Sequence, residues 1–215
     1  MKWIVSLVSL SVLAITANAS AQDAPAPRPA KSGGRGAFVA GAKVGGILPF
    51  DGLNPSLVGT LEVGYIFPWF RRRFALLVDV GYAVPRKTGN VPSDVRVADG
   101  NYDWELTQKE LTIAPTILFR LTKLGRVVPY IGVGPRIYLL RSIVEGKVGG
   151  ETILETTEQS TKVGLSAPLG AEFRLGPGAL VGEFVFEWGP LNHVTTGDGT
   201  STLGGNLQLG YRFMI

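Results

Sequence analysis

The chain has 215 residues, with 45% hydrophobic and 18% charged residues, 29 glycines, no cysteine and a formal net charge of +4 at pH 7. The absence of cysteine excludes disulfides and a lipid-modified N-terminal cysteine. The length suggests one domain once a leader is removed. The basic excess is slight, which argues against nucleic acid as a partner.

Residues 1–21 predict a cleavable export signal. Met1 and Lys2 give it a positive start, residues 3–15 form an apolar run broken only by serines, and residues 19–21 fit the small-x-small cleavage pattern. We expect Gln22 to begin the mature chain. The alternative is an uncleaved membrane anchor, but the apolar run is shorter than the roughly 20 residues that a spanning helix needs.

Residues 22–36 form a separate segment in which Pro25, Pro27 and Pro29 alternate with alanine before a stretch of glycine and basic residues. The segment has no hydrophobic periodicity and too little apolar mass to pack. We therefore expect a flexible periplasmic leader. A peptidoglycan-binding role for its positive charges is the alternative.

From Ala37 onward, eight segments alternate apolar and non-apolar residues. They cover residues 38–48, 57–67, 74–82, 110–120, 131–139, 162–174, 180–188 and 203–215. Side chains of a strand point to opposite faces in turn, so each segment predicts a strand with one apolar face. No stretch of this part approaches a transmembrane helix. A soluble β-sandwich is the alternative, but eight apolar stripes would overfill a core between two packed sheets.

The connections between these segments alternate in length. Tight turns at 68–72, 122–126 and 176–178 separate mostly long, polar connections at 49–56, 85–103, 141–161 and 189–202. Bacterial outer-membrane barrels show this asymmetry, with short periplasmic turns and longer extracellular loops. The predicted fold class is therefore all-β, an eight-stranded antiparallel up-and-down transmembrane β-barrel over residues 37–215. An even strand number puts both of its ends in the periplasm.

The non-apolar faces carry six cations and six anions, which predicts a balanced charge network inside a narrow barrel. Buried charges are costly unless they are paired, whereas lipid outside tolerates none of them near its midplane. The predicted interior network consists of Lys43, Glu62, Asp79, Glu110, Arg120, Arg136, Lys162, Glu172, Arg174, Glu183, Glu187 and Arg212.

Three prolines, Pro115, Pro135 and Pro168, lie inside predicted strands. Each removes a backbone donor from a barrel that has no free edge, so we expect local bulges, above all near Pro135. Trp104 and Leu106 are out of phase with the strand that follows them. This predicts another bulge there, or a loop-like top to that strand.

The eight segments, the sequence Val-Pro-Tyr-Ile-Gly-Val-Gly at 128–134 and the final Leu-Gln-Leu-Gly-Tyr-Arg-Phe-Met-Ile at 207–215 resemble the small outer-membrane barrels of the OmpA-barrel, OmpX and OmpW type. The resemblance implies the outer membrane of a Gram-negative bacterium, with outer-membrane lipids and the barrel-assembly machinery as partners. It implies that Tyr211, Phe213 and Ile215 form the assembly signal. The family usually ends in Phe or Trp, whereas this chain ends in Ile215.

No catalytic pattern stands out, and we expect a non-enzymatic protein without cofactor or metal. His193 is the single histidine, and Ser201 is the nearest serine that could join it in a lipid A-modifying enzyme, which is a weaker alternative. We expect a structural or cell-surface interaction role, with an extracellular ligand at the loops 85–103 and 141–161. The main alternative is an OmpW-like transporter or small channel for small hydrophobic compounds.

Overall fold

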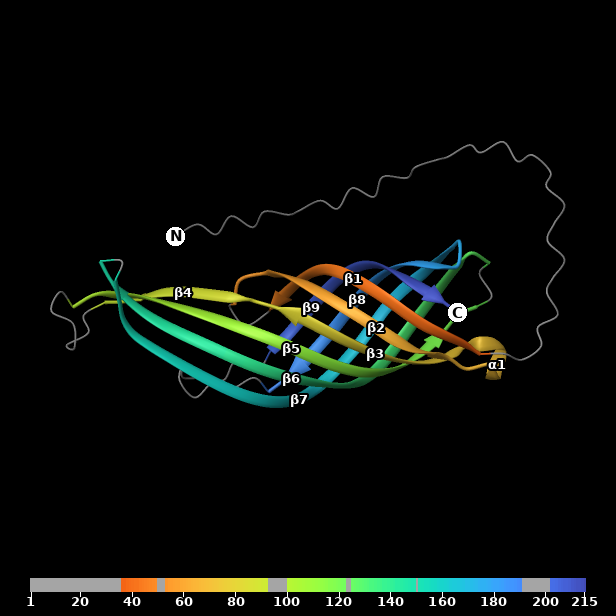
Figure 1. The fold of residues 1–215 in the computed structure, drawn as a ribbon, viewed down its shortest axis with the longest axis horizontal. Coiled ribbons are helices and arrows are strands. Elements are labelled where there is room, and N and C mark those ends of the chain that lie inside the picture. The colour runs from red at the N-terminus through yellow and green to blue at the C-terminus, as the bar shows by residue number, and fades with distance from the viewer. Residues whose placement is uncertain (1–35, 50–52, 93–99, 123–124, 150, 191–201) are drawn as a thin grey trace, which may run out of the picture. The chain divides into compact units, whose positions relative to one another are not determined.

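The computed structural model describes residues 36–49, 53–92, 100–122, 125–149, 151–190 and 202–215 (Figure 1). The predicted signal peptide at 1–21, nearly all of the leader at 22–36 and both His193 and Ser201 lie outside these residues. The strands are β1 (Ala37–Pro49), β2 (Ser56–Ile66), β3 (Phe74–Ala83), β4 (Arg86–Val91), β5 (Tyr102–Arg120), β6 (Val127–Val148), β7 (Glu151–Leu175), β8 (Gly178–Gly189) and β9 (Thr202–Met214), and α1 (Trp69–Arg72) lies between β2 and β3.

The strands form one closed antiparallel sheet. Their order is β3-β2-β1-β9-β8-β7-β6-β5-β4, and β3 also pairs with β5, which closes the barrel. At the junction of the first and last strands, the amide N of Phe38 donates to the carbonyl O of Ile215 and the amide N of Ile215 donates back, both at 2.9 Å. Closure leaves the membrane part of the barrel without an unpaired edge.

The strands β3 and β4 together occupy one position in the barrel. Both pair with β5, β3 along Glu110–Phe119 and β4 along Tyr102–Thr107. Pro85 stands in the break between them, where a residue without an amide hydrogen interrupts a strand. The nine strand segments therefore make an eight-stranded barrel, as the sequence predicts.

The side chains obey the predicted alternation of faces. Val44, Leu57 and Leu209 on the outer face are 64%, 79% and 67% exposed, whereas Lys43, Thr60 and Gln208 on the inner face are buried. Residues 131 and 133 point outward and Arg136 points inward, so the predicted phase of β6 is correct as well. No helix among the described residues is long and apolar enough to span a bilayer.

The prolines interrupt the hydrogen-bond ladder without shifting it, so the bulge predicted near Pro135 is wrong. The β5–β6 pairing stops after Ile113↔Ile137 and resumes at Ile117↔Val133 in the same register, and the gap contains Pro115 and Pro135. A proline lacks only its own donor, and the neighbouring pairs hold the strands in phase. The one register shift between β6 and β7 lies at Gly146/Lys147, far from these prolines.

Three strands continue well beyond the barrel, which corrects the prediction of loops at 85–103 and 141–161. β5, β6 and β7 have 19, 22 and 25 residues, against 13 for β1 and 12 for β8. Their far ends and β4 extend toward the left of Figure 1. This part, which we call the projecting sheet, consists of β4 and residues 102–110, 140–148 and 151–164. It also explains Leu106, which lies on the inner face of a regular strand without a bulge.

Candidate functional site

The lumen is closed at one end by an apolar layer. We call this the short-turn end, because it holds the tight turns after β2, β5 and β7. The layer consists of Ala37, Val39, Ile66, Ala75, Leu77, Leu118, Tyr130 and Val181, with Met214 packed against it. These side chains belong to the first or last few residues of their strands. There, the inward-facing positions, which are polar along most of each strand, are occupied by apolar residues. Their burial closes the lumen with apolar side chains at this end.

Lys43 stands at the centre of the charged layer above it. Its Nζ lies 3.2 Å from Oε2 of Glu62, 3.1 Å from Oδ2 of Asp79 and 2.8 Å from Oε1 of Glu183. Glu62 and Asp79 face each other across the β2–β3 pairing. Two adjacent carboxylates repel each other, and a cation between them offsets that repulsion. Lys43 therefore joins strands β1, β2, β3 and β8 through the lumen.

Arg212 extends this network to the neighbouring acids. Its Nε and Nη2 donate to the two carboxylate oxygens of Glu62 at 2.5 and 2.6 Å, and its Nη1 binds Glu172. Arg120 binds the same Glu172. The Tyr130 hydroxyl donates to Glu183 at 2.8 Å, and the guanidinium of Arg212 lies 5.3 Å from the centre of the Tyr130 ring. Paired, hydrogen-bonded charges of this kind are the form in which ions are tolerated in a protein interior.

A second group of polar residues lies where the lumen meets the base of the projecting sheet, and Gln108 and Glu110 belong to both. Arg136 Nη1 lies 2.9 Å from Oε1 of Glu187, and Arg136 Nη2 donates to Thr112 at 3.1 Å. Asn206 donates to Glu187 at 3.0 Å, and Gln108 donates to Glu110. All six of these residues are buried. Both groups together fill the lumen with side chains.

Two of the twelve predicted network residues lie elsewhere. Arg174 is exposed because it stands next to the end of β7 at Leu175, on the rim of the barrel. Lys162 is half-exposed because β8 joins β7 only from Leu165 onward, so Lys162 stands where the barrel wall is incomplete. The prediction assigned every charge on a non-apolar face to the lumen, and it did not locate the ends of the lumen.

Neutral polar residues of the lumen were missed as site residues. Gln108, Asn206 and Gln208 are buried beside the charged groups, and Tyr130 binds Glu183. Asn206 and Gln208 alternate with outward leucines in β9, so the period-two pattern was a signal that could have found them. Tyr130 and Gln108 carried no such signal, because an aromatic ring is not expected inside and Gln108 lies between the predicted connection 85–103 and the predicted strand 110–120.

The three residues of the predicted assembly signal lie on the outside of β9 and just after it. Tyr211 donates to the carbonyl O of Leu175 at 2.6 Å and packs edge-on against Phe213, with ring centres 4.7 Å apart. Phe213 and Ile215 are 50% and 84% exposed. Their role in assembly remains the implication of the resemblance.

The projecting sheet has a polar outer face. Arg86 Nη1 lies 3.5 Å from Oε1 of Glu105, and Lys147 Nζ lies 3.1 Å from Oε2 of Glu105 and 3.0 Å from Oε2 of Glu145. The hydrogen bonds to Glu145 and Glu105 raise the pKa of Lys147. These pairs link β4, β5 and β6 across the face, although exposed pairs contribute little to stability.

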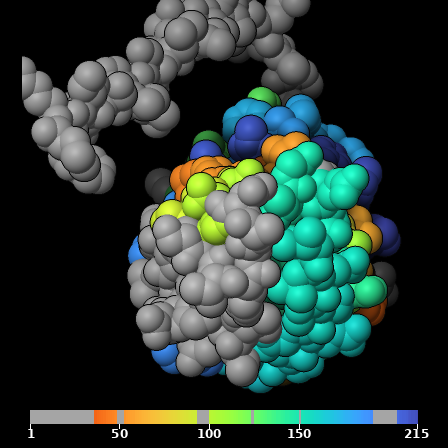
Figure 2. All heavy atoms as spheres, turned by 90° about the vertical axis from the view of Figure 1, so that its left-hand side faces the viewer, coloured from red at the N-terminus to blue at the C-terminus, as the bar shows by residue number. Residues whose placement is uncertain are grey.

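Its inner face is mixed, because an apolar far part is followed toward the barrel by the polar residues Ser142 of β6 and Thr156, Glu158, Ser160 and Lys162 of β7. Val91, Tyr102, Trp104, Val144, Val148 and Leu154 alternate with the polar residues of the outer face. Gly89 lies against the Trp104 ring so closely that a Cβ would come within 2.5 Å of it, and Leu154 and Tyr102 approach Gly146. The far part of the projecting sheet is thus amphipathic. Figure 2 views the molecule from this end, where the hairpin of β6 and β7 covers one side.

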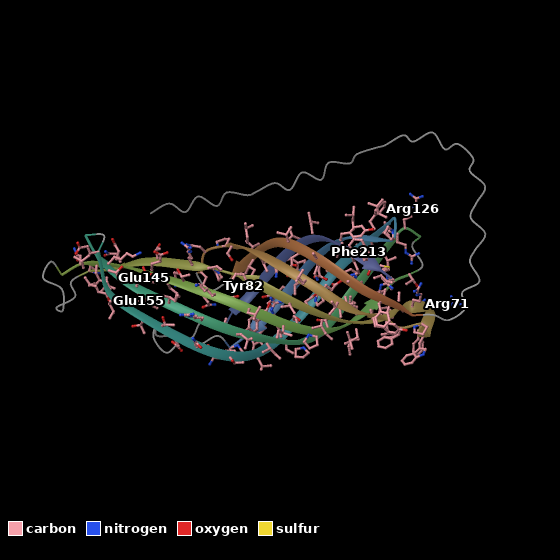
Figure 3. The ribbon with its side chains drawn as sticks, in the orientation of Figure 1. Arg71, Tyr82, Arg126, Glu145, Glu155 and Phe213 are labelled. Carbon is pink, nitrogen blue, oxygen red and sulfur yellow. The ribbon has the colours of Figure 1, made fainter. Side chains whose placement is uncertain are left out.

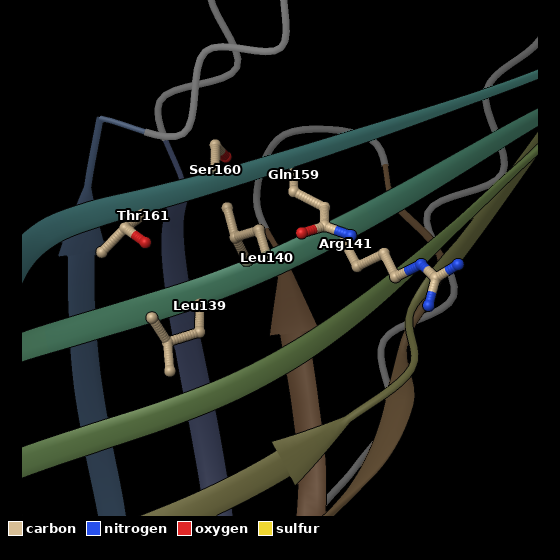
Figure 4. A pocket seen from close by; sticks show the side chains of 6 residues that line it. All are labelled: Leu139, Leu140, Arg141, Gln159, Ser160 and Thr161. Atoms are coloured by element: carbon tan, nitrogen blue, oxygen red, sulfur yellow. The ribbon is translucent and has the colours of Figure 1, made fainter.

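A shallow hollow marks the base of the projecting sheet. It is lined by three neighbouring register pairs of β6 and β7, namely Leu139↔Thr161, Leu140↔Ser160 and Arg141↔Gln159 (Figure 4). It offers one cation and several hydroxyl or amide groups. Among the described residues, no three His, Asp or Glu side chains gather as a metal ion would need.

No family model and no curated protein matches the chain. Solved structures are similar to it. A major outer membrane protein from Thermus thermophilus is 15% identical, with 84% of this chain and 100% of that chain covered and a TM-score of 0.51. Neisserial surface protein A is 16% identical, with 83% and 96% covered and a TM-score of 0.45. Ail of Yersinia pestis, solved with the heparin analogue sucrose octasulfate, is 15% identical, with 85% and 99% covered and a TM-score of 0.42.

The fold of this chain is that of the small outer-membrane β-barrels. Its eight-stranded closure and its apolar outer face agree with this likeness. At such low identity the likeness concerns the fold alone, and the function has to be argued from this chain's own residues.

Proposed function

We propose that this outer-membrane β-barrel has a structural and surface-interaction role, with the projecting sheet as its contact surface and a lumen that passes no solute. As part of the same proposal, the short-turn end and the N-terminus are periplasmic, and the projecting sheet lies outside the cell. The even number of barrel strands and the short turns at one end support this orientation.

One observation carries the proposal, the pairing of β7. β8 pairs with β7 only from Leu165 to Leu175, so within the described chain the stretch 151–164 has β6 as its one strand neighbour. A strand with a neighbour on one side can receive an extended segment of another protein, whose backbone supplies the affinity. Threonine is frequent in this stretch, and it is a good strand former.

The lumen supports the part of the proposal that concerns transport. An eight-stranded barrel is just wide enough for its own side chains to fill it. Here an apolar layer, the ion pairs around Lys43 and the pair of Arg136 with Glu187 follow one another along the axis. This arrangement favours a structural barrel over a transporter that uses the lumen. We propose no catalytic role.

Photo-crosslinking in living cells tests the contact surface. A photoreactive residue at position 159 on β7 should give a discrete crosslinked partner, whereas the same residue at position 109 on the polar face of β5 should not. The double variant Ile153→Lys and Thr157→Lys should abolish the product at 159, because lysines on an edge strand oppose strand addition.

A second variant removes the far ends of β6 and β7, including residues 151–156 of the proposed contact edge, and keeps the barrel. Residues 144–156 are replaced by Asn-Gly, which joins the register partners Ile143 and Thr157 through a two-residue hairpin turn. The variant should keep the heat-dependent gel migration of a folded barrel and lose the partner. The proposed role is wrong if neither position crosslinks discretely, or if the shortened protein captures the same partner equally well.

A further inference from the structure

Aromatic rings form two continuous rows at the short-turn end. One row runs Phe38, Tyr65, Phe67 and Trp69, with ring centres 5.1, 5.4 and 5.3 Å apart. The other runs Phe70, Phe74 and Phe119, with centres 5.5 and 5.4 Å apart. Such rings favour the boundary between hydrocarbon and headgroups. They fix the depth of the bilayer surface on this end of the barrel.

Five arginines lie beside that boundary. Arg71, Arg72, Arg126 and Arg174 are exposed and Arg73 is half-buried. Arg73 Nε is shielded from solvent and has no hydrogen-bond partner among the described residues. Figure 3 shows Arg71 and Arg126 at this end with Phe213, and Glu145 and Glu155 at the opposite end. A guanidinium with spare donors is suited to bind phosphate.

These arginines form one arc of the rim. The Thr122 hydroxyl donates to the carbonyl O of Arg71 at 3.4 Å, which joins the turn after β2 to the turn after β5. The amide N of Arg174 donates to the carbonyl O of Arg126 at 2.9 Å, which joins that turn to the end of β7. These contacts place the turn after β2, the turn after β5 and the end of β7, which are distant in the sequence, next to one another on the rim.

The turn after β2 has an unfavourable backbone that displays its arginines. Phe70, Arg71 and Arg72 have φ values of 48°, 61° and 61°, in the left-handed region that residues with a side chain avoid. Arg120 holds this turn, because its Nη1 donates to Arg72 O at 3.1 Å and its amide N donates to Arg73 O at 2.7 Å. The carbonyls face the barrel, and the side chains of Arg71 and Arg72 face outward.

No acidic side chain opposes these cations among the described residues. The exposed acids are Asp103, Glu151 and Glu155, all on the projecting sheet, and the acids nearer the rim, such as Glu62 and Glu172, are buried in the lumen. The exposed surface of the short-turn end therefore has a positive potential. A soluble anionic partner would need only the positive charge, wherever it lay on the protein. The arginines lie beside the aromatic rows, and this position points to a ligand anchored in the bilayer.

We propose that the arc formed by Arg71, Arg72, Arg73, Arg126 and Arg174 binds the phosphate of an anionic phospholipid in the bilayer leaflet at the short-turn end. The aromatic rows hold the acyl chains beside it, and the arginines replace the counter-ions of the headgroup. In the orientation proposed above, this is the periplasmic leaflet. The lipid site itself does not depend on that orientation or on any surface partner.

The test uses the mature protein in phosphatidylcholine vesicles that contain spin-labelled phosphatidylglycerol or spin-labelled phosphatidylcholine. Electron spin resonance then gives the relative association of the two lipids with the protein. We expect a preference of roughly fivefold or more for phosphatidylglycerol, the size of effect that one cation near an anionic surface produces. The quadruple variant Arg71→Gln, Arg72→Gln, Arg126→Gln and Arg174→Gln, which keeps only Arg73 of the arc, should lower the preference severalfold.

A matched variant changes four cations at the other end, Arg86→Gln, Lys87→Gln, Lys109→Gln and Arg141→Gln, and should keep the wild-type preference. Heat-dependent gel migration checks that both variants are folded. The site is wrong if this matched variant loses as much preference as the quadruple arginine variant does. It is also wrong if the wild-type protein shows no preference.

Inorganic phosphate separates a lipid site from a site for free anions. Added phosphate should lower the preference no more than chloride at the same ionic strength, because the lipid is held by its chains as well as by its phosphate. If phosphate displaces the labelled lipid much more strongly than chloride does, the arc is a site for a soluble anion and the lipid proposal is wrong.

Discussion

Lys43 is the residue on which the lumen depends most. It contacts three carboxylates from three strands, and one of them, Glu62, also binds Arg212. Removal of the cation leaves buried acids with too few partners, and an unpaired buried charge is far more costly than a missing surface charge. The loss of Lys43 is therefore expected to lower the free energy of unfolding more than the loss of a cation on the surface.

The variant Lys43→Met should lower the free energy of unfolding by about 3–5 kcal/mol, the usual effect of breaking a buried ion pair. Lys109→Met serves as the control, because Lys109 is exposed on the projecting sheet and its loss should stay within the error of the measurement. Urea titration of the folded band on gels measures both. Equal stability of the two variants would show that the charges around Lys43 do not support the barrel.

The alternation of the sequence was enough to put Lys43, Glu62 and Arg212 inside, because lipid excludes charge from the other face. It could not give their partners. Lys43 and Glu183 are 140 residues apart, and their contact at 2.8 Å depends on how the strands are staggered around the barrel. Arg174 shows the other limit, since a residue on the correct face still lies outside the lumen when its strand ends there.

Gly134 of β6 packs closely against the backbone of β5. A Cβ on Gly134 would lie 2.0 Å from the carbonyl O of Pro115, whereas a Cβ on Gly59 in β2 would have nothing within 4 Å. Gly134→Ala should destabilise the barrel by about 1–3 kcal/mol, as overpacking does. Gly59→Ala should be neutral or slightly stabilising. Comparable unfolding midpoints for both variants would contradict the tight contact at the proline gap.

At the scale of strands, the projecting sheet was the main element that the sequence analysis missed. Residues 141–161 are polar, and they were assigned to a loop because no apolar stripe faces lipid there. A strand outside the membrane needs no such stripe. The signal was present in the alternation of Val144, Gly146 and Val148 with Glu145 and Lys147, and in the frequent threonines of β7.

Two outward-facing residues of β7 lie on either side of the boundary between the membrane part and the projecting sheet. Leu169 is 59% exposed and Ile153 is 53% exposed, but Leu169 pairs with Phe184 inside the barrel wall, whereas Ile153 lies in the projecting sheet. Leu169→Arg should cost about 2–4 kcal/mol or prevent assembly, because lipid surrounds it. Ile153→Arg should assemble normally. Heat-dependent migration of both variants checks this, and an equal response would mean that the boundary is misplaced.

The whole molecule combines a closed barrel with a filled interior. Eight strands leave room for side chains but not for a wide channel, and the strand number was readable from the sequence because lipid imposes a strict alternation on every strand. The layers inside the lumen were not readable. They depend on which inward residues share a height along the axis, and that height follows from the stagger of the strands.

The conductance of the purified protein in a planar bilayer tests the central claim most directly. We expect little or no steady conductance, because the apolar layer at the short-turn end and the ion pairs of Lys43 and Arg136 leave no continuous path for water. The double variant Glu183→Gln and Glu187→Gln should destabilise the barrel without producing a selective channel, because Arg136 loses Glu187 and Lys43 loses one of its three carboxylate partners. Large ohmic wild-type channels, with an ion selectivity that follows those two substitutions, would contradict the filled lumen.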